Sequence, residues 1–142
     1  MANLSVHFSS KTDLWATPQD VFDALNDEFC FTLDPCATKE NAKCTKFFTR
    51  SDDGLEQEWC GNSIFVNPPY GREIGKWVQK AYEESYCPSG SRAVMLLPAR
   101  TDTKWFHNYI YGKAEVRFIK GRLKFGDGKG SAPFPSMIAI FK

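Results

Sequence analysis

Asn67-Pro68-Pro69-Tyr70 is the segment whose residue types point most directly to chemistry. It follows a short apolar run at residues 63–66, which predicts a buried strand bounded by turn residues. The two prolines stiffen the backbone after this strand and keep Asn67 out of the α-helical region. The loop offers an amide oxygen, backbone carbonyls and an aromatic ring. We therefore expect it to bind a flat group that carries an NH2, at the sheet edge where open α/β folds place their ligands.

Asp34-Pro35-Cys36-Ala37 is a second candidate site, at the end of another predicted strand. A carboxylate in this position can bind the cationic amine of an amino-acid-like ligand. An isolated Asp-Pro pair after a strand is more often only a turn. Adjacent parallel strands would bring this loop and the Asn67 loop to one edge of the sheet, which favours a shared site.

Two further segments could complete a ligand site. Thr17, close after Trp15, is expected to cap a helix in which Pro18 takes the first position, and the free N–H groups there favour a carboxylate. The alternative is capping by Thr17 alone. Asp52 or Asp53 could accept a hydrogen bond from an adenine amine, and the alternative for both is an Asp-Gly turn.

Basic and aromatic residues follow the strongest apolar run, residues 93–97. Arg100 and Lys104 could meet phosphates, whereas Trp105 could stack on a base or simply pack. Whether the pattern marks a nucleic-acid surface depends on where the fold places these side chains.

A second basic segment lies near the carboxyl end of the chain. Arg122 and Lys124 alternate with other residues and lead into a Gly-rich loop at 126–130, an arrangement that could reach a DNA groove or backbone. The alternative is a solvated hairpin edge guarded by lysine. Residues 132–136 are stiff and aromatic, so this segment, with Phe134 at its centre, could line a target pocket.

The elements that must position these residues alternate along the chain. Helices are predicted at 17–29, 72–86 and about 103–111, and strands at 30–34, 46–49, 63–67, 93–97, 115–119 and 136–141. This order predicts an α/β fold with a mostly parallel sheet, helices on its faces and an antiparallel hairpin at the carboxyl end. We expect residues 1–142 to form one domain, with a loosely ordered amino terminus at 1–13.

Composition and charge narrow the function classes. The chain has 142 residues, of which 42% are apolar and 25% charged, as in ordinary globular domains. Residues 1–58 carry a net charge of −6 and residues 59–142 a net charge of +7. The basic half could follow a phosphate backbone and the acidic half could suit a cationic cofactor, although an ordinary solvated surface would look similar.

The cysteines, the apolar segments and the amino-terminal residues indicate in which cellular compartment the protein is expected. The five cysteines are odd in number and form no C-x-x-C pair, which favours reduced thiols over a disulfide framework or a zinc site. No apolar stretch is long enough to span a bilayer, and no secretory signal pattern begins the chain. We therefore expect no metal, no membrane association and a cytoplasmic location.

Taken together, these residues resemble the bacteriophage DNA N6-adenine methyltransferase family, which is compact and lacks a separate recognition domain. The matching segments follow one another through nearly the whole chain: Trp15-x-Thr17-Pro18, Leu33-Asp34-Pro35-Cys36-Ala37, Asp53-Gly54-Leu55, Asn67-Pro68-Pro69-Tyr70-Gly71, residues 97–106, Gly121-Arg122-Leu123-x-Phe125 and Ala132-Pro133-Phe134-Pro135-Ser136. One departure is that Ala37-Thr38-Lys39-Glu40 replaces the usual glycine-rich turn after the first strand. The helix after that turn should be short or missing.

The resemblance implies a compact Rossmann-like fold, S-adenosylmethionine as cofactor and double-stranded DNA as substrate. The Asn67 oxygen and the Pro68 carbonyl would accept the N6 hydrogens of a flipped-out adenine, on which Tyr70 would stack, with Pro69 stiffening the loop. The cofactor-binding residues would be Trp15, Thr17, Asp34, Pro35, Cys36, Ala37 and Asp53. The DNA-binding residues would be Arg100, Lys104, Trp105, Arg122, Lys124 and Phe134.

Other functions remain open at this point. Methyltransferases that use similar loops act on other amino groups, such as adenine in RNA or a glutamine amide in protein. Pro68-Pro69 could instead be a polyproline ligand for a partner domain, and an inactive relative would act through binding alone. A homodimer is an alternative to a monomer, because the chain is small for a DNA-binding enzyme.

Overall fold

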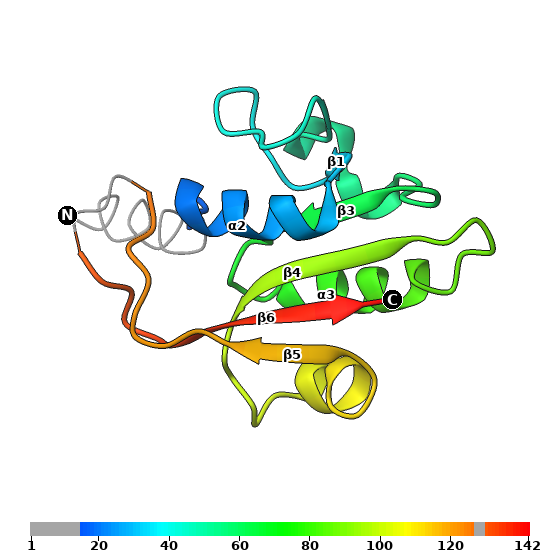
Figure 1. Ribbon diagram of the computed structural model, residues 1–142. Helices are drawn as coiled ribbons and strands as arrows, with labels where there is room; N and C mark the ends of the chain where they lie inside the picture. The colour runs from blue at the N-terminus through cyan, green and yellow to red at the C-terminus, as the bar shows by residue number, and fades with distance from the viewer. Residues whose placement is uncertain (1–14, 127–129) are drawn as a thin grey trace.

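The computed structural model describes residues 15–126 and 130–142. The predicted loose terminus at 1–13 and residues 127–129 of the Gly-rich loop lie outside the described residues. The elements are α2 Gln19–Phe29, β1 Leu33–Asp34, β2 Lys46–Phe47, η1 Arg50–Asp52, η2 Gly54–Glu56, β3 Ser63–Val66, α3 Ile74–Glu84, β4 Arg92–Pro98, η3 Phe106–Ile110, β5 Glu115–Phe118 and β6 Ser136–Phe141 (Figure 1). None of the described helices combines the length and the apolar character needed to cross a bilayer.

One mixed sheet organises the chain, with strand order β2-β1-β3-β4-β6-β5. The first four strands run parallel, and β6 pairs antiparallel with both β4 and β5. The predicted α/β fold, with its mostly parallel sheet and antiparallel closing hairpin, is therefore confirmed. Leu33 pairs with Ile64 on the adjacent strand, so Asp34 and Asn67 reach the same edge of the sheet, as the sequence predicted.

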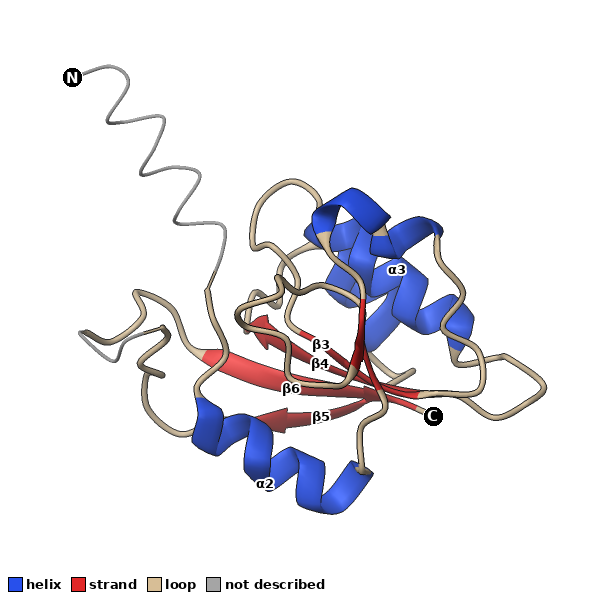
Figure 2. Ribbon diagram, turned by 90° about the horizontal axis from the view of Figure 1, so that it is seen from above, coloured by secondary structure: helices blue, strands red, loops and turns tan. Residues whose placement is uncertain are grey.

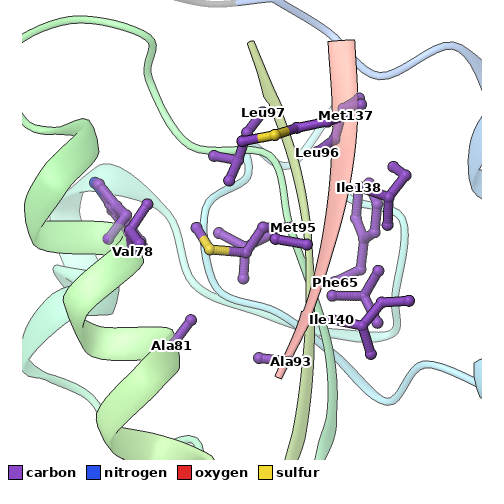
Figure 3. Close-up of a cluster of buried hydrophobic side chains, with 14 of the residues drawn as sticks. Phe65, Val78, Ala81, Ala93, Met95, Leu96, Leu97, Met137, Ile138 and Ile140 are labelled. Atoms are coloured by element: carbon purple, nitrogen blue, oxygen red, sulfur yellow. The ribbon is translucent and has the colours of Figure 1, made fainter. Parts of the chain in front are cut away.

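Helices α2 and α3 cover opposite faces of the sheet (Figure 2). The apolar side of α3 includes Val78 and Ala81, which point toward Ala93 and Met95 of β4 (Figure 3). On the other face, Phe22 of α2 meets Phe65 of β3 edge to face, with 5.2 Å between the ring centroids. Because both faces of β4 are covered, this strand can be apolar at nearly every position, which explains the continuous run in the sequence.

Most of the predicted bounds shift by one or two residues, and the largest change is at the strand predicted over residues 30–34. Cys30 adopts a left-handed conformation with φ 50° and ends α2 by donating its N–H to the Asn26 carbonyl at 2.8 Å. The strand therefore begins at Leu33 rather than at residue 30. The helix expected at about 103–111 spans residues 104–110, and its last five residues form the π-helical turn η3, in which the Tyr111 N–H bonds to the Phe106 carbonyl at 2.8 Å.

The segment after β1 contains no helix between residues 35 and 45, all of which are described. Thr38 and Asn41 close a tight turn there by bonding each other's backbone N–H groups through their side chains. The predicted loss of a helix after the first strand is thus confirmed. The segment considered as an Asp-Gly turn instead contains the end of η1 at Asp52 and the start of η2 at Gly54, with Asp53 between the two short helices.

The expectation that all cysteines are reduced is wrong for one pair. Cys60 and Cys87 form a disulfide, with their Cα atoms 5.7 Å apart, whereas Cys30, Cys36 and Cys44 are free. The two partners stand 27 residues apart in no recognisable motif. The fold brings them together because the turn before β3 lies beside the turn before β4, where the Gly61 N–H donates to Ser91 Oγ at 2.9 Å.

Candidate active site

The side chain of Asn67 lies just beyond β3 and is fixed from one side only. Its Nδ2 donates to the backbone carbonyl of Trp15 and to Thr17 Oγ1, the latter at 2.9 Å. An amide nitrogen has two hydrogens, so both are used. The Asn67 Oδ1 atom is buried, and within the described residues it has no hydrogen-bond partner. A buried carbonyl oxygen without a partner is costly, which makes it a candidate acceptor for a ligand's N–H groups.

This contact corrects the prediction for Thr17. The N-cap of α2 is Pro18, without a side-chain cap hydrogen bond, and the first helical bond runs from the Phe22 N–H to the Pro18 carbonyl. The Thr17 hydroxyl therefore does not cap the helix, because it faces the Asn67 amide instead. Pairing between segments 50 residues apart leaves no local pattern in the sequence.

Tyr70 belongs to an aromatic cluster formed by Trp15, Tyr70, Phe125 and Phe134. Its ring centroid lies 6.1 Å from that of Phe125 and 5.6 Å from that of Phe134, both edge to face. Trp15 meets the same two phenylalanines at 5.5 and 5.2 Å. Only 5% of Tyr70 is exposed, so the ring is covered where the sequence predicted an open stacking surface. Stacking on a base stays a prediction that requires Phe125 and Phe134 to move.

The hydroxyl of Tyr70 is also fixed, since it donates to the Leu96 carbonyl at 2.7 Å. Burial raises the pKa of Tyr70 well above its ordinary value, so the group stays neutral. The phenol therefore serves as an anchor for the ring.

The two phenylalanines of the aromatic cluster lie in the segment between β5 and β6, called here the arm (residues 120–126 and 130–135). The arm lies at the same end of the sheet as the segment before α2 (Figure 1). The Gly126 N–H donates to the Ala16 carbonyl at 2.9 Å, and the Ala99 N–H donates to the Pro135 carbonyl at 2.9 Å. These bonds attach the arm to the segment before α2 and to the end of β4.

Asp34 is a buried carboxylate, 4% exposed, at the end of β1. Its Oδ2 accepts the Lys43 N–H at 3.0 Å and its Oδ1 accepts the Cys36 N–H at 3.4 Å. Burial raises the pKa of Asp34 to about 6, and the two backbone N–H groups oppose that rise. The neighbouring Cys36 thiol also has a raised pKa, about 12, mainly because of burial, so it stays protonated. A cationic ligand would favour the ionised form of Asp34.

A cavity of about 490 Å³ opens at the loops that follow β1 and β3, close in the chain to Asp34 and Asn67, neither of which is among its lining residues. Its lining includes Pro35, Cys36, Asp53, Pro69 and Trp77. The cavity therefore joins the three loops that the sequence predicted to share one site. A second cavity of about 560 Å³ is lined by Arg92, Lys142 and neighbours at the amino ends of β3 and β4. It contains none of the predicted site residues.

The structure distinguishes between the two candidate aspartates. Asp52 is engaged locally, because its Oδ2 accepts both the N–H and the hydroxyl of Thr49, and these bonds lower its pKa. Asp53 lines the cavity and adopts a left-handed conformation with φ 55°. The following residue must be glycine, since a Cβ on Gly54 would overlap the Pro35 carbonyl oxygen.

The predicted DNA-binding residues divide into two groups. Arg100, Lys104, Arg122 and Lys124 are exposed. The Arg100 guanidinium lies 5.8 Å from the centre of the Phe134 ring, which places the basic group next to the aromatic cluster. Trp105 is 9% exposed and packs on α3 at Gly75, so the packing alternative holds for this residue.

Two residues in this region, Ser136 and Phe125, were included in sequence motifs but were not named individually as site candidates. Ser136 is 1% exposed, and its Oγ is the other buried side-chain polar atom without a partner in the described part of the chain. Ser136 pairs with Pro98, at the same sheet edge as Asn67. Phe125 was noted only as part of a motif. Neither had a distinguishing signal, because a serine at a strand start and a phenylalanine in a basic segment are both ordinary.

Comparisons with known proteins identify the family of the chain. Residues 5–139 match the model of a family described as DNA N-6-adenine-methyltransferase (Dam). The DNA N-6-adenine-methyltransferase of Haemophilus phage HP1 is 32% identical over 141 residues, which cover 94% of this chain and 80% of the relative. The DNA N-6-adenine-methyltransferase of Escherichia phage T1 is 34% identical over 113 residues, covering 78% of this chain and 46% of the relative. The chain therefore belongs to the Dam family of DNA N-6-adenine-methyltransferases, the class of enzyme that the sequence predicted.

Proposed function

We propose that this enzyme transfers a methyl group from S-adenosylmethionine to N6 of an adenine rotated out of double-stranded DNA, with Asn67 as the principal acceptor of the N6 hydrogens. The observation that carries the proposal is the Asn67 amide itself. Both Nδ2 hydrogens are used by the protein, whereas the buried Oδ1 has no partner in the described residues. An exocyclic amine supplies the N–H donors that this oxygen lacks.

Asn67 and Pro68 would act on the electrons of the amine. The adenine N6 lone pair is conjugated with the ring, and acceptors for both N–H groups help to draw it out of that conjugation. The nitrogen becomes positive as it is methylated, so the same hydrogen bonds strengthen in the transition state. The backbone carbonyl of Pro68, in the stiff Asn-Pro-Pro turn, is the second acceptor that we assign.

The residues at the end of β1 fit the cofactor. When bound, S-adenosylmethionine supplies an electrophilic methyl group on a sulfonium. Asp34 would hold its cationic amine, because a buried carboxylate with no cationic partner among the described residues gains most from a cation. Asp53 lines the adjoining cavity and would accept a hydrogen bond from the adenine amine of the cofactor. The cavity volume of about 490 Å³ lies within the usual range for small-molecule sites.

The aromatic cluster would receive the target base. Rotating a base out of a duplex costs a few kcal/mol, roughly, and stacking on an aromatic side chain returns about 1–3 kcal/mol. In the structure, Phe125 and Phe134 cover the Tyr70 ring. We propose that these two rings move aside so that the base can stack on Tyr70, with Phe134 as one wall of the pocket.

The exposed basic residues support DNA as the substrate. Arg122 and Lys124 lie on the arm, and Arg100 follows β4, so the cations gather at the sheet edge where Asn67 lies. Such residues would contact phosphates and position the duplex without reading its sequence. Lys104 would extend this surface. The proposed substrate also supports a location in the bacterial cytoplasm, where double-stranded DNA is found.

One experiment tests the proposal against its rivals. The protein is incubated with methyl-labelled S-adenosylmethionine and unmethylated duplex DNA, RNA or protein, and each product is digested and identified by mass spectrometry. We expect N6-methyladenine in DNA alone, and labelling that is slower by about 1,000-fold with Asn67→Ala. Label in RNA adenine or in glutamine, with none in DNA of varied sequence, would overturn the proposed substrate.

A further inference from the structure

The segment before α2 determines which way the Asn67 amide points. Trp15 provides a backbone carbonyl and Thr17 provides a hydroxyl oxygen, and both face Asn67 Nδ2. Because these two acceptors use both amide hydrogens, Oδ1 must point away from them. Rotating the amide by 180° would place Oδ1 against the Trp15 carbonyl oxygen, which cannot donate. The protein therefore allows one orientation of this side chain.

We propose that Trp15 and Thr17 are positioning residues for methyl transfer, which aim Asn67 Oδ1 at the N6 hydrogens and make asparagine, rather than aspartate, the functional residue at this position. The inference rests on the proposed role of Asn67. It differs from the role expected from the sequence, in which Thr17 binds the carboxylate of the cofactor.

The two acceptors are themselves held in place. The Trp15 ring packs edge to face on Phe125 and Phe134 at 5.5 and 5.2 Å, and the Ala16 carbonyl accepts the Gly126 N–H. Thr17 is β-branched, so its χ1 angle is restricted. Its hydroxyl takes no part in capping α2 and remains available to the amide. Both acceptors are thus pre-organised, as a positioned catalytic group requires.

The same geometry excludes aspartate. A carboxylate at position 67 would place an oxygen against the Trp15 carbonyl oxygen, and neither atom carries a hydrogen. Thr17 could turn its hydroxyl to donate to the carboxylate, whereas Trp15 has no such freedom. Hydrogen bonding from Nδ2 to two oxygens should also polarise the amide and make Oδ1 a better acceptor, an effect that a displaced carboxylate loses.

The test compares Thr17→Val with Thr17→Ser in the full-length protein. Valine keeps the branched shape and removes the oxygen, whereas serine keeps the oxygen. Single-turnover methylation rates are measured on duplex DNA, and S-adenosylmethionine affinity is measured by calorimetry. We expect Thr17→Val to slow methyl transfer about 10- to 100-fold with cofactor affinity retained. Thr17→Ser should restore most of the rate.

Three outcomes separate the possible explanations. A Thr17→Val enzyme with the wild-type rate would overturn the inference, as would a loss confined to cofactor affinity, which would assign Thr17 to the cofactor carboxylate. If Asn67→Ala itself retains turnover, the proposed role of Asn67 fails first. Thr45→Val, on an exposed threonine, is the matched control for the substitution and should behave as wild type.

Asn67→Asp provides an independent test of the Trp15 contact. We expect this variant to lose methyl transfer at neutral pH, about 100-fold or more, while circular dichroism and cofactor affinity stay close to wild type. Wild-type turnover by Asn67→Asp would contradict selection of the amide by the Trp15 carbonyl.

Discussion

The two sides of the active site are built in different ways. The proposed cofactor side consists of the buried Asp34 and an adjoining cavity, which is lined mainly by residues 35–55 together with Pro69, Glu73 and Trp77. The acceptor side, formed by Asn67 with Thr17 and the aromatic cluster, joins segments about 50 or more residues apart and is closed. The proposed cofactor side has a cavity of about 490 Å³. On the proposed acceptor side the Tyr70 ring is covered by Phe125 and Phe134, so our proposal requires these two rings to move before a base can stack there.

The largest effect should come from the acceptor side. Asn67→Ala removes the only group that we assign to the N6 hydrogens through a side chain. We expect the methyl-transfer rate to fall about 1,000-fold while cofactor affinity is largely kept, because Asn67 contributes mainly in the transition state. Single-turnover kinetics measure the methyl-transfer rate, and calorimetry measures the cofactor affinity. If Asn67→Ala loses cofactor affinity together with the methyl-transfer rate, Asn67 also contributes to cofactor binding, and the proposed division into two sides is wrong.

Asp34→Ala should have the opposite signature. Loss of a buried carboxylate that faces a cationic amine should weaken cofactor binding about 30-fold or more, before any effect on the rate at saturating cofactor. Calorimetry measures the affinity, and Asp27→Asn on the exposed face of α2 is the control. An unchanged dissociation constant would remove Asp34 from the cofactor side.

Gly54→Ala tests whether the cofactor side depends on close backbone packing. A methyl group there would overlap the Pro35 carbonyl oxygen and approach the Trp77 ring to 3.0 Å. We expect a loss of about 1–3 kcal/mol in unfolding free energy, together with weaker cofactor binding. Thermal denaturation and calorimetry test this. Gly75→Ala, within α3 and with its nearest neighbours at 3.7 Å, is the matched control and should not destabilise the fold.

Cofactor affinity should depend on pH through Asp34. Its pKa is raised from 3.8 to about 6, so the free protein holds a neutral acid below that pH. A cationic amine prefers the carboxylate, so affinity should rise up to about tenfold per pH unit toward pH 6 and then level off. Calorimetry between pH 5 and 7 tests the slope, which should vanish in Asp34→Asn.

The raised pKa of Asp34 should also make folding stability depend on pH. Stability should fall with rising pH, whereas cofactor affinity should rise. The folded chain binds a proton at Asp34 more tightly than the unfolded chain does. The contribution of Asp34 to the stability of the cofactor-free protein therefore falls as the pH rises from 3.8 to about 6. Denaturant unfolding of wild type and Asp34→Asn across this range should show the difference, and parallel curves would contradict it.

The smallest effect should come from the anchor of the aromatic cluster. Tyr70→Phe removes the hydroxyl that donates to the Leu96 carbonyl, at a cost of about 1 kcal/mol in unfolding free energy, and keeps the ring. We expect a lower melting temperature and a nearly unchanged methyl-transfer rate. A large loss of rate would mean that the hydroxyl, rather than the ring, acts on the substrate.

The same contrast explains which parts of the molecule could be predicted. The Asp34 turn and the Asn-Pro-Pro-Tyr loop depend on local chemistry, since proline and strand-end residues determine the backbone around themselves. The sheet followed from alternating apolar segments. These features were visible in the sequence and the structure confirms their positions.

The missed features are all contacts over long distances in the chain. The sequence predicted that Thr17 caps a helix, because a threonine followed by a proline and then an aspartate is a common pattern at helix starts. Only the fold shows that the Thr17 hydroxyl faces Asn67. The burial of Tyr70 depends on Phe125 and Phe134, and the Cys60–Cys87 bond depends on two turns meeting. No local spacing encodes such pairings.

The hydrogen bond between Gly126 and Ala16 has a consequence for the order of events on DNA. Ala16 lies between the two residues that orient Asn67, so the arm and the acceptor share one mechanical connection. If DNA moves Phe125 aside to admit a base, as we propose, this movement of the arm would also act on the segment that holds the Asn67 amide. Binding that leaves this connection strained would delay the chemistry, whereas binding that restores it would commit the base to reaction.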